Sequence, residues 1–255
     1  MSLKSNVLLL FIFLFLIGVS NVFAQELDDN SGQESEYVSE EPSKTSFINI
    51  TSKEVEGYLK GEYNRAYTYY GEISAIGAVE FNKMVKLRGG LAVGRSVGNT
   101  DVGAFINACY SPFTNIPLNF SLSYINNWLP EYKSHTQTIL PLVSFNARIA
   151  GVSLGINFRF SSYFDDPAIF ESILTFFAYF NIINTSSLKI GAGAGNFNDF
   201  YAKNIGAYSL LIYSVLYLDE NLSIMNDIEI MQSGGDGLTA NFYGFAWRGG
   251  VKYSW

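Results

Sequence analysis

The chain has 255 residues, of which 48% are hydrophobic, 16% aromatic and only 15% charged, and its formal net charge is −7. This composition excludes a disordered protein, which is rich in charge and poor in aromatic residues, and the acidic balance excludes a nucleic-acid binder. One cysteine and one histidine exclude an internal disulfide and leave almost no basis for histidine catalysis or metal ligation. The apolar residues therefore need either a large soluble core or a membrane.

Residues 1–24 have the three parts of a secretory signal peptide. Lys4 precedes the apolar run of residues 7–19, and small or aliphatic residues follow at Val22 and Ala24. The run is about thirteen residues long, which is shorter than the roughly 20 that a spanning helix needs. We therefore expect cleavage after residue 24 and export, with an uncleaved anchor as the alternative. Because Cys109 is the only cysteine, none lies at the cleavage point to carry a lipid.

Residues 25–44 form an acidic leader. The segment has seven acidic residues, is rich in Ser, Asn and Gln, and has no basic residue before Lys44. It lacks apolar periodicity, so we interpret it as a disordered periplasmic tail or spacer. The rest of the chain, 45–255, keeps 14 basic and 16 acidic residues and has a net charge of −2. The acidity of the protein thus belongs mostly to the leader.

The remaining chain alternates between apolar and polar residues with a period of two. In segment 152–163, for example, Val152 and Leu154 belong to one face, and Ser153 and Asn157 to the other. Such alternation predicts β-strands. No later apolar run is long enough for a spanning helix, which excludes a helical membrane bundle. Twelve segments show the pattern: 53–63, 67–81, 84–95, 101–112, 118–128, 137–149, 152–163, 172–183, 188–196, 205–218, 221–231 and 241–255.

Three features complicate this count. Segments 172–183 and 205–218 are apolar on both faces, so their inward side stays unassigned. Pro141 would remove a ladder hydrogen bond from segment 137–149, which predicts a strand that starts after it or carries a bulge there. Ten strands remain the alternative to twelve.

The connections between the segments alternate between short and long. Short turns such as 82–83 and 150–151 are followed by longer loops such as 129–136 and 232–240. Strands of about 9–11 residues joined in this way are typical of membrane barrels, with the short turns in the periplasm. The prediction is an all-β fold, a single antiparallel up-and-down transmembrane β-barrel over 45–255. An even strand number places both chain ends in the periplasm.

The end of the chain carries the most specific local pattern. Val251, Tyr253 and the terminal Trp255 are apolar or aromatic at every second position. Residues 53–255 thereby resemble the bacterial outer-membrane β-barrel proteins. The resemblance implies outer-membrane location, contact with lipid, and delivery to the barrel-assembly machinery through this terminal strand. No motif selects among the acidic-sugar porins, nucleoside channels and phospholipases of similar size.

The charged residues of the strands fall on the face opposite the apolar one, so we predict that they line the lumen. The predicted lumen charges are Glu54, Glu56, Lys60, Glu62, Glu72, Glu80, Lys86, Arg88, Arg148, Arg159, Lys189, Asp227, Glu229, Arg248 and Lys252. Closure of the barrel would place Arg248 and Lys252 between acidic strands. A mixed-charge lumen predicts a narrow porin-like channel for small solutes or ions. The alternatives are a closed structural barrel whose surface loops mediate interaction or adhesion, and a secreted soluble ligand-binding barrel.

No enzymatic, cofactor or metal site is predicted. His135 lies in an expected loop without a matching Ser and Asn constellation, and Cys109 has no histidine partner. The glycine-rich stretch 191–195 sits in a strand without a following helix, unlike a phosphate-binding loop. The stretch 234–237 indicates a turn rather than a calcium loop. The oligomeric state is left open.

Overall fold

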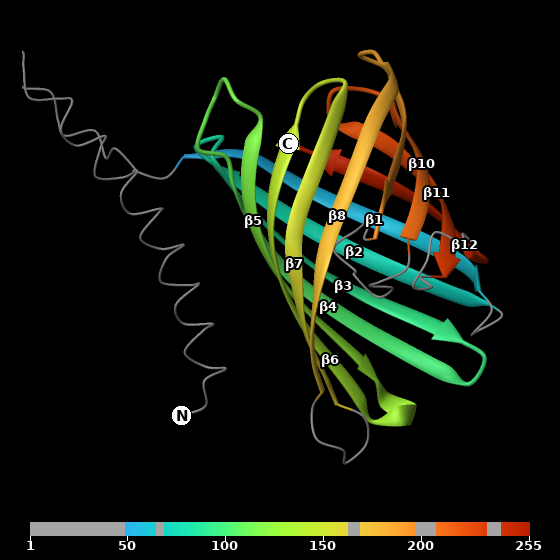
Figure 1. Cartoon of the computed structure of the whole chain (residues 1–255). Helices are drawn as coiled ribbons and strands as arrows, with labels where there is room; N and C mark the ends of the chain where they lie inside the picture. The colour runs from blue at the N-terminus through green and yellow to red at the C-terminus, as the bar shows by residue number, and fades with distance from the viewer. Residues whose placement is uncertain (1–48, 65–68, 163–168, 197–207, 234–240) are drawn as a thin grey trace, which may run out of the picture. The chain divides into compact units, whose positions relative to one another are not determined.

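The computed structural model describes residues 49–64, 69–162, 169–196, 208–233 and 241–255. The expected signal peptide and acidic leader, residues 1–44, lie outside these ranges. Twelve antiparallel strands form a closed barrel in which each strand pairs with its neighbours in the chain, and β12 closes on β1 (Figure 1). The all-β up-and-down barrel is therefore confirmed, and the ten-strand alternative is wrong. The strands are β1 Ile50–Asn64, β2 Tyr70–Phe81, β3 Val85–Ser96, β4 Asn99–Tyr110, β5 Leu118–Leu129, β6 Ser134–Asn146, β7 Ala150–Ser162, β8 Ile169–Asn184, β9 Leu188–Gly195, β10 Tyr208–Tyr217, β11 Leu222–Ser233 and β12 Asn241–Ser254.

All of the strands except β9, which has 8 residues, are long enough to cross a bilayer. Every strand except β9 and β10 has at least 12 residues, whereas a tilted spanning strand needs about 9–11. The described residues include one short 3-10 helix, η1 Pro130–Tyr132, between β5 and β6. Among the described residues, no helix is both long enough and apolar enough to cross a membrane.

The two faces of the sheet have opposite polarity, and the apolar face is the outer one. On β1, Val55 is 49% exposed and the next residue, Glu56, is 5% exposed. On β2, Ile73 is 66% exposed and Glu72 is 7% exposed. A soluble barrel would place the apolar residues inside and the polar ones outside. The observed polarity is that of a barrel whose outer surface meets lipid, and it argues against the soluble ligand-binding alternative.

The structure assigns the inward faces of β8 and β10, which the sequence left open. On β8 the buried positions include Thr175 and Asn181, while Leu174 is exposed on the outside. On β10 Leu211 is buried and Ile212 exposed. The faces were hard to separate because the inward positions here are themselves apolar or aromatic. The inward positions that cause the ambiguity are Phe177, Tyr179, Leu211, Tyr213 and Val215.

The strand around Pro141 differs from both predicted forms. β6 starts at Ser134, before the proline, and its register to β7 is the same on both sides of it, from Ile139↔Phe158 to Leu142↔Gly155. Pro141 itself pairs with Leu122 of β5. The strand therefore accommodates a residue without an N–H by a local gap in one ladder rather than by a bulge.

The tight turn between β2 and β3 marks one end of the barrel, called here the short-turn end. Residues 82–84 connect the paired residues Phe81 and Val85, and the Met84 N–H donates to the Phe81 carbonyl at 2.9 Å. Asn82 and Lys83, the two central residues of this turn, have φ values of 51° and 56°, as a type I′ turn requires. The Asn82 side chain also accepts a hydrogen bond from the backbone N–H of Asn49 at 3.0 Å. The opposite end, where β1 ends and β2 begins, is called the long-loop end.

Candidate functional site

The interior wall carries nearly all of the charges expected there from the sequence. Alternation of buried and exposed residues along each strand gives the inward positions. The expected residues found at inward positions are Glu54, Glu56, Lys60, Glu62, Glu72, Glu80, Lys86, Arg88, Arg159, Lys189, Asp227, Glu229, Arg248 and Lys252. The exception is Arg148, which lies exposed in the turn 147–149 because β6 ends at Asn146. It is therefore not part of the wall.

Two further acidic residues were missed by the sequence analysis. Asp101 on β4 shares its face with the buried Phe105 and Asn107, and its Oδ2 accepts a hydrogen bond from Tyr70 Oη at 3.4 Å. The alternation along β4 contained the signal for it. Glu171 lies opposite Arg159 in the β7–β8 register, and it was missed because β8 had no assignable inward face.

A network of ion pairs joins three strands toward the short-turn end. Glu54 accepts from Lys86 Nζ at 2.6 Å and from Lys252 Nζ at 2.9 Å, so that bases on β3 and β12 meet one carboxylate on β1. Glu56 accepts from Arg88 Nη2 at 3.0 Å and lies 3.9 Å from Lys252 Nζ. This network gathers three bases around two carboxylates and crosses the seam at which the first and last strands meet.

Tyr58 occupies the middle of the β1 wall. Its hydroxyl donates to Glu56 Oε2 at 2.8 Å and contacts Met225 Sδ at 3.3 Å. Its ring lies against Gly250 of β12, where an added Cβ would be 2.3 Å from Tyr58 Cδ1. The Arg248 guanidinium lies 5.0 Å from the ring centroid and also donates to Asp227, with Nε at 2.8 Å. Tyr58 thus separates the ion-pair network from the charges nearer the long-loop end.

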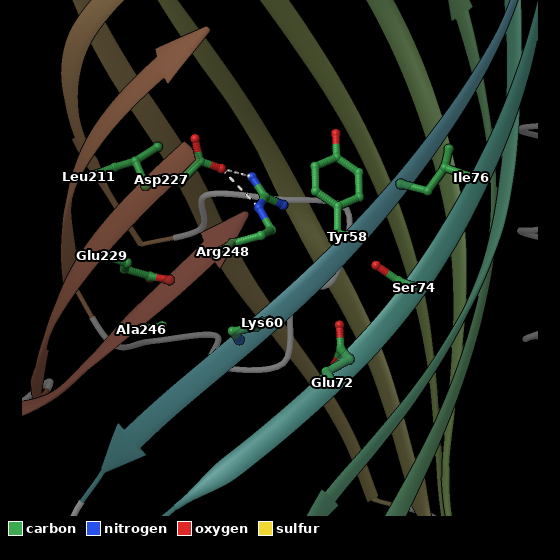
Figure 2. A pocket seen from close by; sticks show the side chains of 10 residues that line it. All are labelled: Tyr58, Lys60, Glu72, Ser74, Ile76, Leu211, Asp227, Glu229, Ala246 and Arg248. Carbon is green, nitrogen blue, oxygen red and sulfur yellow. Dashed lines mark hydrogen bonds and ion pairs between the residues drawn. The ribbon is translucent and has the colours of Figure 1, made fainter. Parts of the chain in front are cut away.

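A cavity opens beside Tyr58 on the same side of the barrel. Figure 2 shows its lining side chains, with Arg248 lying between Asp227 and the Tyr58 ring. The lining residues come from β1, β2, β10, β11 and β12: Tyr58, Lys60, Glu72, Ser74, Ile76, Leu211, Asp227, Glu229, Ala246 and Arg248. The cavity therefore combines charges of both signs with an aromatic ring and three aliphatic side chains.

The other side of the interior is packed rather than open. Inward side chains in the middle of β4 to β8 are buried, and Leu140 and Asn157 are 0% exposed. Phe105 and Ile125 join Tyr58 and Ile76 in one apolar cluster. The amide of Asn157 and the hydroxyl of Thr175 are buried without a hydrogen-bond partner. The interior thus has a packed sector over β4–β8 and a charged sector over β11, β12 and β1–β3.

Lys189 is a basic residue held by aromatic rings instead of carboxylates. Its Nζ lies 5.9 Å from the Tyr179 ring centroid and 5.7 Å from that of Tyr213. The Tyr213 hydroxyl donates to Asn181 Oδ1 at 2.6 Å, and Asn181 Nδ2 donates to the Arg148 carbonyl at 2.7 Å. This chain of contacts fixes the side chains of β8, β9 and β10 at the short-turn end.

His135 lies on a strand and faces outward, not in a loop. His135 pairs with Trp128 of β5 and Ser162 of β7. The sequence pattern did not predict a strand here, because the first residues of β6 are polar on both faces. The His135 Nε2 lies 2.5 Å from Asn126 Oδ1. The Ser162 hydroxyl donates to the His135 backbone carbonyl at 3.4 Å, so it is aimed at the main chain rather than at the imidazole. Serine, histidine and asparagine thus lie close together here, which the sequence analysis did not detect.

The remaining motifs give no site in the described residues. Cys109 is a free thiol at an inward position of β4, and residues 191–195 lie within β9. The stretch 234–237 lies outside the described residues. Within the ranges that the structure describes, no group of three or more His, Cys, Asp or Glu is placed to hold a metal ion.

The sequence matches no protein-family model and no curated protein. The fold matches solved structures of porins. The KdgM porin in complex with disordered oligogalacturonate aligns with a TM-score of 0.55 and 10% identity, covering 79% of this chain and 99% of that one. The NanC porin aligns with a TM-score of 0.52 and 9% identity, covering 77% of this chain and 98% of that one. The likeness is one of fold, since so few residues are identical.

Proposed function

We propose that the chain is an outer-membrane channel through which small solutes or ions pass along the charged sector of the interior. The observation that carries the proposal is the polarity of the barrel, which is apolar outside and charged inside. A membrane explains the outer face, and a water-filled passage gives a reason for charged side chains on the inner one. The porin fold of the structural neighbours supports the same conclusion.

The packed sector of β4–β8 restricts where solutes can pass. We infer that the passage runs beside β11, β12, β1 and β2, where the cavity lies. In the described part of this sector, bases and acids are largely paired with each other. The passage is therefore narrow and of mixed charge, without the surplus of basic groups that an acidic polymer such as oligogalacturonate would need.

A closed barrel is the second candidate function. The ion pairs that cross the seam and the buried side chains of the packed sector favour it. In that case the barrel is a closed structural scaffold whose surface loops contact a partner. A fully inserted protein that never conducts would identify this candidate as the correct one.

Planar bilayers distinguish the two candidates. We expect purified full-length protein to give discrete, ohmic conductance steps, and Arg88→Glu with Arg159→Glu to shift the reversal potential toward cation selectivity. An unchanged reversal potential in a conducting variant would contradict a passage that runs along the charged sector near Arg88.

We also propose that Val251, Tyr253 and Trp255 form the signal read by the barrel-assembly machinery. All three side chains are exposed on the outer face, and the Tyr253 and Trp255 rings stack with centroids 5.7 Å apart. The terminal strand offers this apolar edge before β1 covers its backbone. Catalysis is not part of the proposal, because the Ser162 hydroxyl donates to the His135 backbone carbonyl and not to its imidazole.

A further inference from the structure

We propose that the cavity of Figure 2 binds the ammonium or guanidinium group of an organic cation, with Glu229 as its counter-ion. The inference rests on the proposed channel function and names the class of solute that the passage recognises. Two observations support the inference. Several charged residues of the cavity are already paired with each other or with neighbours, and aliphatic side chains line the cavity beside them.

Glu229 is the carboxylate that is open to a ligand. It lies at an inward position of β11 and lines the cavity. Among the residues that the structure describes, it takes part in no hydrogen bond or ion pair. Asp227, two residues along the same face, is occupied by Arg248. A carboxylate next to a low-dielectric wall attracts a cation more strongly than one in bulk water.

The two bases that line the cavity are held by other groups. Lys60 Nζ lies 2.8 Å from Glu62 Oε2, and Arg248 combines its ion pair with Asp227 and its contact with the Tyr58 ring. Among the described residues, neither base forms an ion pair with Glu229, and Glu72 adds a further carboxylate to the lining. The lining has three carboxylates and two bases, so its formal net charge is negative. We therefore expect the solute group that binds there to carry a positive charge.

The rest of the lining fits the carbon skeleton of such a solute. Ile76, Leu211 and Ala246 are buried aliphatic residues that face the cavity. Methylene groups gain free energy from contact with such a surface. The combination of one open carboxylate and an aliphatic wall selects an organic cation over a small hydrated inorganic one.

The test is calorimetric titration of the folded full-length protein in detergent with spermidine, and separately with citrate as a trivalent anion. We expect spermidine to bind and citrate not to bind. Glu229→Gln should weaken spermidine binding by roughly tenfold or more, since it removes a charge-assisted hydrogen bond. Glu171→Gln is the matched control, because Glu171 is an inward carboxylate of β8 that does not line the cavity. Heat-modifiable gel mobility establishes that each variant is folded.

The outcomes separate this inference from the channel proposal. Equal spermidine affinities of Glu229→Gln and wild type, or binding of citrate in place of spermidine, would overturn the cation site. Loss of spermidine affinity in Glu229→Gln but not in Glu171→Gln would support it. Spermidine binding by a protein that is silent in planar bilayers would refute the channel while leaving the site in place. Conductance without spermidine binding would refute only the site.

Discussion

Lys86 on β3 reaches across β2 to Glu54 on β1, and its Nζ lies 2.6 Å from Glu54 Oε2. Lys86 pairs with Glu80 of β2 and Glu54 pairs with Ala78, so the contact runs diagonally across β2. Lys252 of β12 meets the same carboxylate at 2.9 Å. The Glu54 side chain thus links β3 and β12, which lie on opposite sides of β1, the strand at which the barrel closes.

Glu54→Gln should weaken this connection, because it leaves Lys86 and Lys252 without their common counter-charge. We expect the free energy of unfolding to fall by about 1–3 kcal/mol, as for the loss of a partly buried hydrogen-bonded ion pair. Urea unfolding of the barrel in phospholipid vesicles measures it. Glu171→Gln removes the same charge from an exposed position and should change the unfolding free energy little. Equal losses in the two variants would contradict the role of Glu54.

The contact between Tyr58 and Gly250 predicts a position-specific cost of adding one methyl group. A Cβ at Gly250 would lie 2.3 Å from the Tyr58 ring and 2.9 Å from the Gly57 carbonyl, whereas a Cβ at Gly57 meets nothing within 4 Å. We therefore expect Gly250→Ala to destabilise the barrel by about 1–3 kcal/mol and Gly57→Ala to be close to neutral. The same unfolding assay compares them. A neutral Gly250→Ala would show that Tyr58 does not need this glycine.

Most of the fold was predictable from the sequence, because alternation reports directly which face of a strand meets lipid. Alternation fails where the inner face is apolar, as at Phe177 and Tyr213, and where the outer face is polar, as at His135. The alternation predicts on which face a charged residue lies, but not with which residue it pairs. The Lys86–Glu54 contact skips a whole strand, so no pattern along one strand could reveal it.

Deletion of Trp255 should impair assembly more than loss of another outward tryptophan. The deletion removes the outward ring and the two backbone hydrogen bonds that join Trp255 to Lys53, at 2.9 and 3.0 Å. We expect a lower fraction of folded protein in the outer membrane, measured by heat-modifiable mobility after fractionation. Trp128→Ala, on the outer face of β5, is the control and should assemble normally. Normal assembly of the deletion variant would contradict the signal role of the terminal strand.

Glu131 predicts a pH-dependent contact at the long-loop end. The Thr100 backbone N–H donates to Glu131 Oε2 at 3.0 Å, and this bond holds the pKa of the exposed carboxyl below its usual value. The contact is therefore present above the usual pKa and is lost as the pH falls through the lowered one. We expect protection of the Thr100 amide from hydrogen exchange, corrected for intrinsic rates, to fall across that range. Glu131→Gln should abolish this pH dependence, and persistence of it in the variant would contradict the assignment.

The central claim is that solutes pass along the charged sector beside β2, and single-channel conductance in planar bilayers tests it most directly. Ser74 is a buried residue of the cavity lining, and Ile73 is the next residue of β2, exposed on the outer face. We predict discrete conductance steps for the wild type, clearly smaller steps for Ser74→Phe, and unchanged steps for Ile73→Phe. Absence of steps from inserted wild-type protein, or equal steps in all three proteins, would contradict the account.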